Sequence, residues 1–183
     1  MLELTLFLLG TAAILKLSWR SLGDLRFHGF YRFFAFELLW ALILMNLWVW
    51  FRDPLSARQL ASYFLGAVSI GLAIEGFRLL RAIGRPSAAA ARGANAGFEN
   101  TTALVAVGAY RFIRHPLYAS LLALLWAAWL KDPFGVASIL LTLSATGFFV
   151  ATAVAEEKEN LASFGAEYAA YMQRTRRFIP FVF

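Results

Sequence analysis

The chain contains no cysteine and only two histidines, His28 and His115, in 183 residues. Without cysteine, a disulfide framework, a thiolate metal site and a cysteine nucleophile are excluded, and the redox compartment stays undetermined. Two histidines are too few for a histidine-rich metal site. The chain also has no Walker loop, GxSxG elbow, HExxH pair or GxGxxG turn before a helix, so these nucleotide-binding and hydrolase motifs are absent.

Charged residues are also few. They make up 15% of the chain, whereas a soluble domain carries roughly 25%. Hydrophobic residues make up 61%, and the mean hydropathy is +0.65. A soluble fold of this length cannot bury so much apolar surface, and helices satisfy their own backbone groups in lipid. The composition therefore predicts an all-α integral membrane protein.

Five stretches are apolar enough to cross or deeply enter a membrane: about 2–19, 33–51, 60–80, 117–130 and 134–155. A span needs about 20 residues, so the fourth stretch is short and is expected to pack inside the bundle or to begin within the preceding loop. The polar break Lys131-Asp132-Pro133 joins the last two stretches into a helical hairpin. The apolar N-terminus does not resemble a signal peptide, because no basic region precedes it. We expect about five transmembrane helices.

The basic residues are divided unequally between the two sides that five spans create. One side holds 14 of the 17 Lys and Arg residues, and the other holds Arg52, Arg58 and Lys131. By the positive-inside rule, the C-terminus is predicted to be cytoplasmic and the N-terminus to be outside. The net charge of +6 then reflects membrane topology and not nucleic-acid binding.

The chain divides into three parts. Residues 1–80 hold three apolar stretches, 81–103 form a small, polar cytoplasmic loop, and 104–183 form a C-terminal unit with the hairpin and a cytoplasmic tail. Polar residues also interrupt the apolar stretches, and an ionisable group at membrane depth is a functional candidate by default. These polar residues are Glu37, Asn46 and Glu75. The alternative for the two glutamates is a position near the membrane interface or beside an arginine.

A first cluster of reactive residue types precedes the fourth stretch. Pro116 suits the first turn of a helix, where its missing N–H group would be unpaired in any case. Arg114 and His115 then lie at the N-terminus of that helix, where free N–H groups and the helix dipole favour an anion. Tyr110 and Tyr118 flank them. The alternative is a basic interfacial cap before a transmembrane helix.

A second cluster begins at the glutamate pair that follows the fifth stretch, Glu156 and Glu157. A carboxylate at the end of an aromatic stripe suits a cation, which both groups attract. The alternative is an amphipathic interfacial helix whose acidic residues face water. One helical face is predicted, if the helix continues through Gly165, for five residues with a four-three-four-three spacing: Glu157, Leu161, Phe164, Tyr168 and Tyr171.

The motifs follow one another in a fixed order: Gly108-x-Tyr110-x-x-x-Arg114-His115-Pro116-x-Tyr118, Glu156-Glu157, Phe164-Gly165-x-x-Tyr168-x-x-Tyr171 and Arg177-x-x-Pro180. This order resembles the isoprenylcysteine carboxyl methyltransferase family and its phospholipid methyltransferase relatives, over about 104–180. One departure is Asn160, where relatives often carry an apolar residue, and Leu161 is expected to take over its packing. Another is Val154-Ala155, where basic or proline residues are common.

The resemblance implies a membrane methyltransferase that uses S-adenosylmethionine, bound in a cytoplasmic helical region, and a lipophilic acceptor that enters from the bilayer. An isoprenylcysteine carboxylate, a phospholipid amine and a small isoprenoid all fit, and the sequence selects none of them. It also implies membrane lipids as partners and leaves the oligomeric state open. Arg114 is expected to orient the acceptor, with Glu157 and Glu156 as the alternative catalytic group. The cofactor site is expected to be lined by Tyr110, His115, Pro116, Tyr118, Tyr168 and Tyr171.

Two other functions compete with this interpretation. Membrane reductases of the sterol-reductase type share an Arg-His-Pro-x-Tyr element but bind NADPH. Those reductases resemble one another in a Gly-Leu-Trp element before the motif and in an Asn between its Pro and Tyr. At these two positions this chain has Tyr110 and Leu117. The other alternative is a non-enzymatic membrane scaffold.

Overall fold

The computed structural model describes residues 1–87 and 101–182, and their regular structure is helical apart from one isolated parallel bridge, Ile113 to Arg176. The prediction of an all-α protein is therefore confirmed for this part of the chain. Three short 3-10 turns are η1 (Trp19–Ser21), η2 (Leu47–Val49) and η5 (Gly108–Arg111). The α-helices are α1 (Leu2–Ser18), α2 (His28–Met45), α3 (Ala57–Ala82), α4 (Pro116–Trp129) and α5 (Val136–Arg174).

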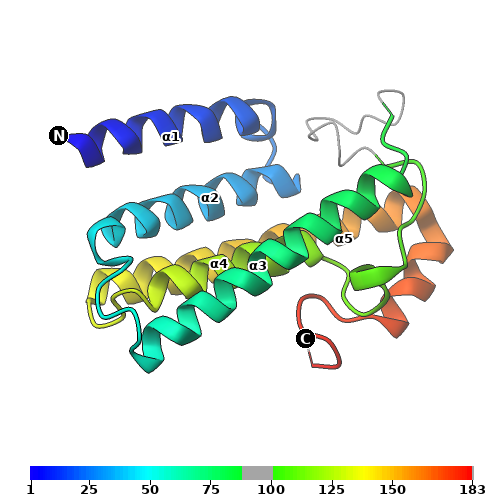
Figure 1. Ribbon diagram of the computed structural model, residues 1–183. Coiled ribbons are helices and arrows are strands. Elements are labelled where there is room, and N and C mark those ends of the chain that lie inside the picture. Colours follow the sequence, from blue (N-terminus) through cyan, green and yellow to red (C-terminus); the bar gives the residue numbers. More distant parts are fainter. Residues whose placement is uncertain (88–100, 183) are drawn as a thin grey trace.

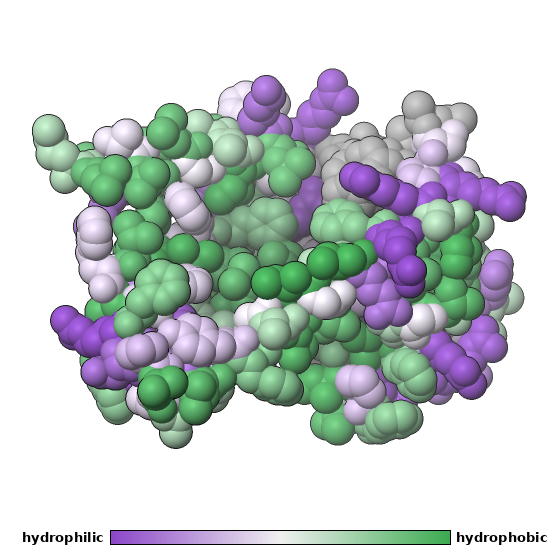
Figure 2. All heavy atoms as spheres, viewed as in Figure 1, coloured by the Kyte–Doolittle hydropathy of each residue, from purple (hydrophilic) through white to green (hydrophobic). Residues whose placement is uncertain are grey.

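Four helices, α1, α2, α3 and α5, are long and apolar enough to cross a membrane, while α4 has only 14 residues. The sequence predicted about five spans with a short fourth, and α4 is that short element. Figure 1 shows the helices running back and forth between two ends of the molecule. Hydrophilic residues gather at these ends, with an apolar surface between them (Figure 2). This distribution fits a multi-pass membrane protein, and which end faces the cytoplasm stays a prediction.

The helices pack as two main pairs. α2 packs on α5, α3 packs on α4, and α1 packs mainly on α2. The largest buried cluster joins α2, α4 and α5 and includes Leu42, Leu125 and Phe149, each fully buried. Because lipid tails are as apolar as these side chains, close packing and polar contacts must hold the helices together.

Polar side chains inside the bundle make such contacts. Asn46 donates to the Ala128 carbonyl at 2.8 Å, which ties α2 to α4. Glu37 accepts from the Thr11 hydroxyl at 2.9 Å, which ties α2 to α1. Glu75 of α3 accepts from the backbone N–H of Ala109 at 3.0 Å. The three polar residues within the apolar stretches therefore each connect two segments of the fold.

The helix α5 is 39 residues long, about twice the length that a membrane span needs. It merges the predicted fifth span with the helix predicted after the paired glutamates. Gly165 interrupts it with φ 54° and ψ −128°, values that a residue without a Cβ adopts readily. The helix bends there, and its last part lies beside the segment before α4 (Figure 1).

The contact between α1 and α2 depends on the absence of a side chain at Gly10. A Cβ there would lie 2.0 Å from Trp40 Nε1, whereas a Cβ at Gly66 of α3 would meet nothing within 4 Å. We expect Gly10→Ala to lower the free energy of unfolding by about 1–3 kcal/mol through overpacking. Gly66→Ala, the control, should be neutral or stabilising by up to about 1 kcal/mol. Unfolding by denaturant in detergent, followed by circular dichroism, measures both, and equal effects would contradict this packing.

Candidate active site

A cavity of about 430 Å³ lies among α2, α3, α4 and α5, whose side chains form most of its wall. Its volume is within the range of about 300–1,000 Å³ that is usual for small-molecule sites. Side chains of all five helices and of the segment 101–105 line it. The cavity therefore joins the C-terminal unit to the N-terminal helices.

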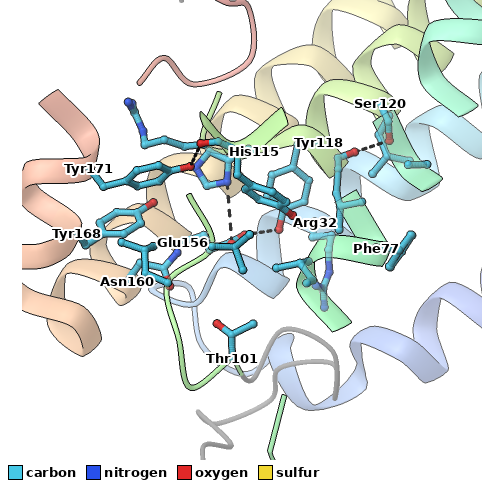
Figure 3. Close-up of a pocket in the computed structure, with 18 of the residues that line it drawn as sticks. Arg32, Phe77, Thr101, His115, Tyr118, Ser120, Glu156, Asn160, Tyr168 and Tyr171 are labelled. Atoms are coloured by element: carbon cyan, nitrogen blue, oxygen red, sulfur yellow. Dashed lines mark hydrogen bonds and ion pairs between the residues drawn. The ribbon is translucent and has the colours of Figure 1, made fainter. Parts of the chain in front are cut away.

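The lining changes character along the helices. Deeper in the bundle it is mostly apolar, with Phe36 on α2, Ala73 on α3 and Leu124 on α4. Toward the end of the cavity beside the loop before α4, it carries most of the polar groups that the sequence singled out. Figure 3 shows His115, Tyr118, Glu156, Tyr168 and Tyr171 there. The lining also includes Tyr110 and Arg114. A ligand with a polar head and an apolar body matches this division.

The loop before α4 and the C-terminal tail pair through their backbones. The Arg114 N–H donates to the Arg176 carbonyl at 2.7 Å, and the His115 N–H donates to the Arg177 carbonyl at 3.2 Å. In return, the Arg176 N–H donates to the Phe112 carbonyl at 3.0 Å. Two segments about sixty residues apart thus form one short parallel bridge at the rim of the cavity.

Glu157 lies behind this bridge and is almost fully buried. Its carboxylate accepts from Arg114 Nε and from Arg177 Nη2, both at 2.8 Å, and lies 3.4 Å from His115 Nε2. The bond to Glu157 also raises the pKa of the Arg177 guanidinium. Because one carboxylate binds a residue of the loop and a residue of the tail, it holds both in place.

The Arg114 guanidinium also binds the end of α5. Its Nη1 donates to the carbonyls of Met172 and Thr175, at 3.2 and 2.6 Å. Together with the bond from Nε to Glu157, these contacts fix Arg114 between the helix end and the tail. The geometry therefore supports a positioning role for Arg114, whereas the orientation of an acceptor by Arg114 stays a prediction.

Glu156, the neighbouring carboxylate, faces the cavity. It accepts from the Tyr118 hydroxyl at 2.6 Å, and its other oxygen lies 4.0 Å from His115 Nδ1. The rings of His115 and Tyr118 stack, with centroids 5.6 Å apart. Figure 3 shows these three side chains together on one wall of the cavity. The wall thus combines a carboxylate with aromatic faces, and both attract a cation.

The tyrosines complete the loop end of the cavity. The Tyr171 hydroxyl donates to the Tyr110 carbonyl at 2.6 Å, and the rings of Tyr168 and Tyr171 lie 5.7 Å apart. Burial, and then the charge of Glu156, raise the pKa of the Tyr110 hydroxyl well above its ordinary value. Tyr110 therefore stays neutral, because both causes oppose its ionisation.

Seven of the nine site residues predicted from the sequence line the cavity. Glu157 and Pro116 do not: Glu157 is behind the wall, and Pro116 is buried in the first turn of α4, where the sequence placed it. The predicted helical face needs a correction. Phe164 lines the cavity as predicted, but Asn160 does so in place of Leu161, which is 36% exposed and does not take over the packing at that position.

Two groups of lining residues that sequence reasoning missed stand out. One consists of apolar side chains of α1 to α4, which no motif marks. The other is Arg32 of α2, which is 3% exposed and lines the cavity. In the sequence, Arg32 is one of the 14 basic residues assigned to one side of the membrane. Its position four residues after His28, on the same helical face, was the available signal.

Known proteins include a methyltransferase that is similar to part of this chain. Over 72 of its residues, which are 39% of its length, this chain is 36% identical to methanethiol S-methyltransferase 1 of Bradyrhizobium diazoefficiens. The matched segment spans 24% of that protein. No protein-family model matches the chain. The similarity is thus confined to about a quarter of a named methyltransferase, and it specifies neither donor nor acceptor.

The two glutamates are expected to respond differently to neutralisation. Glu157→Gln removes the charge that holds Arg114 and Arg177, so we expect the free energy of unfolding to fall by about 1.5–3 kcal/mol. Glu156→Gln keeps an acceptor for the Tyr118 hydroxyl and should cost less than about 1 kcal/mol. Thermal unfolding in detergent compares the two variants. A larger loss in Glu156→Gln would show that the tail is held by other contacts.

Proposed function

We propose that this chain is an integral membrane methyltransferase that uses S-adenosylmethionine and methylates a lipophilic acceptor. The observation that carries the proposal is the Glu156 carboxylate on an aromatic wall of the cavity. The sequence similarity to a named methyltransferase supports the same reaction class.

The residues of the cavity fit this cofactor. Its sulfonium is a cation, and Glu156 with the ring of Tyr118 offers the carboxylate and the aromatic face that a cation prefers. Tyr168 and Asn160, which also line the cavity, offer a hydroxyl and an amide to its polar ends. When bound, S-adenosylmethionine supplies a methyl group on a positively charged sulfur.

The protein's own part in such a transfer is alignment and exclusion of water. Positioning two reactants contributes about 7–11 kcal/mol where their geometry is close to that of the transition state. The tail and the loop, held by Glu157, would form the lip that fixes the cofactor end of the cavity. The apolar residues Phe36 and Leu124 would hold the body of the acceptor at the other end.

Several acceptors fit a cavity with one apolar end. An isoprenylcysteine carboxylate, a phospholipid amine and a small isoprenoid are compatible with it. The name of the similar protein adds a small thiol to this set. Each places a nucleophilic head beside an apolar body, which is the property that the lining selects.

The competing reductase function agrees less well with the charges. A nicotinamide dinucleotide carries several phosphate charges and calls for exposed arginine donors. The wall instead presents the Glu156 carboxylate together with two arginines that are not exposed donors: Arg32 is 3% exposed, and the Nε and Nη1 groups of Arg114 bind protein groups. A scaffold would have no need for a carboxylate inside an aromatic cavity.

Calorimetry of the protein in detergent tests the cofactor. We expect S-adenosylmethionine and its neutral product S-adenosylhomocysteine to bind and NADPH not to bind. Glu156→Gln should weaken the binding of S-adenosylmethionine about tenfold, because the sulfonium loses its counter-charge. It should weaken the binding of S-adenosylhomocysteine, whose sulfur is neutral, less than about threefold. Glu167→Gln, at an exposed position of α5, is the matched control and should change neither. NADPH binding with no response to S-adenosylhomocysteine would favour the reductase.

A further inference from the structure

We propose that Glu75 of α3 is a positioning residue for the cofactor end of the cavity, and that it acts through Tyr110. This inference rests on the proposed methyltransferase function and goes beyond it, because it gives a helix of the N-terminal part of the chain a role in cofactor binding. The sequence alone marks Glu75 only as a polar residue within an apolar stretch.

Glu75 contacts the segment before α4 and not the cavity. Ala73 and Phe77 of the same helix line the cavity, whereas Glu75 does not. Its Oε1 instead accepts from the backbone N–H of Ala109 at 3.0 Å. Ala109 lies in η5, the 3-10 turn in which the next residue is Tyr110. The helix α3 thus both lines the cavity and holds the turn that carries Tyr110.

This contact requires a glycine at position 108. Gly108 has a φ of 57°, a backbone conformation that residues with a Cβ rarely adopt. A Cβ at this position would lie 2.4 Å from Oε1 of Glu75 and 2.7 Å from Cδ1 of Leu79. The backbone of η5 therefore approaches α3 as closely as only glycine permits.

The turn is held from two sides. Leu79, one helical turn after Glu75, packs with Val105 and Tyr110 in a buried cluster. On the other side, the Tyr171 hydroxyl donates to the Tyr110 carbonyl at 2.6 Å. The position of Tyr110 is therefore set by α3 and by the last part of α5 together.

The side chain of Tyr110 belongs to the cofactor end. It lines the cavity with Tyr168 and Glu156, and the charge of Glu156 acts on its hydroxyl. A neutral tyrosine hydroxyl can donate and accept. It therefore offers a hydrogen bond to a polar group of the cofactor, close to the carboxylate proposed for the sulfonium. A shift of η5 away from α3 would displace this hydroxyl.

Calorimetry with S-adenosylhomocysteine in detergent tests this role. We expect Glu75→Leu, which removes the acceptor and leaves the Ala109 N–H unpaired, to weaken binding about tenfold. Glu75→Gln keeps an oxygen that can accept, and its affinity should stay within about threefold of the wild type. Gly108→Ala, in which the new Cβ pushes η5 away from α3, should also weaken binding about tenfold.

Two control variants match these changes at other places. Glu37→Leu removes a carboxylate of α2 that binds Thr11 and not η5. Gly66→Ala adds a methyl group to α3 where nothing lies within 4 Å. Neither should change the affinity. Circular dichroism at the temperature of the calorimetry shows which variants are folded, and Gly108→Ala serves as the test where Glu75→Leu is not.

A double-mutant cycle with Tyr110→Ala separates positioning from a general loss of structure. Because Glu75 acts through Tyr110, Glu75→Leu should weaken binding less than about twofold once the tyrosine side chain is absent. A general loss of structure would instead lower the affinity by the same factor in both backgrounds.

Three results would overturn the proposal while the wild type binds S-adenosylhomocysteine. They are unchanged affinity in a folded Glu75→Leu or Gly108→Ala, an equal loss for Glu75→Leu with and without the Tyr110 side chain, and an equal loss in Glu37→Leu. A wild type that does not bind S-adenosylhomocysteine rejects the methyltransferase function itself, and this inference with it.

Discussion

The carboxylate of Glu157 is the contact on which the candidate site depends. It binds Arg114 of the loop before α4 and Arg177 of the tail, and both bonds are 2.8 Å long. A buried carboxylate between two guanidinium groups is favourable because each charge is paired and hydrogen-bonded, whereas removal of one member leaves a buried charge uncompensated. The backbone pairing of loop and tail runs alongside this pair. Together with the bond from the Tyr171 hydroxyl to the Tyr110 carbonyl, these contacts hold the tyrosines that follow Gly165 near His115.

The cavity lies among the packed helices. α2 packs on α5, α3 packs on α4, and side chains of all four of these helices line the space that remains between them. Toward the loop end, tyrosines and charged groups line that space, and deeper in the bundle Phe36 and Leu124 do so. An amphiphile is the ligand that matches such a lining, since the polar groups can contact its head while the apolar side chains contact its body.

The sequence allowed the helices to be predicted, because each apolar stretch signals its own span. It also allowed most of the loop-end residues to be predicted, because Tyr110, His115 and Tyr118 stand at fixed spacings around one proline. It did not reveal that Asn160 lines the cavity and that Leu161 is exposed, since a helical face is wide enough to include either position. Contacts such as Asn46 with the Ala128 carbonyl depend on how helices meet, and no local pattern marks that.

Arg32 is the clearest case of a cavity residue that the sequence alone does not reveal. A basic residue near the end of an apolar stretch is usually explained by membrane topology. Only the packing of α2 on α5, which brings Glu159 to His28, makes Arg32 a buried and oriented charge. The cavity then holds a carboxylate from α5 and a guanidinium from α2, each anchored by its own aromatic or imidazole neighbour.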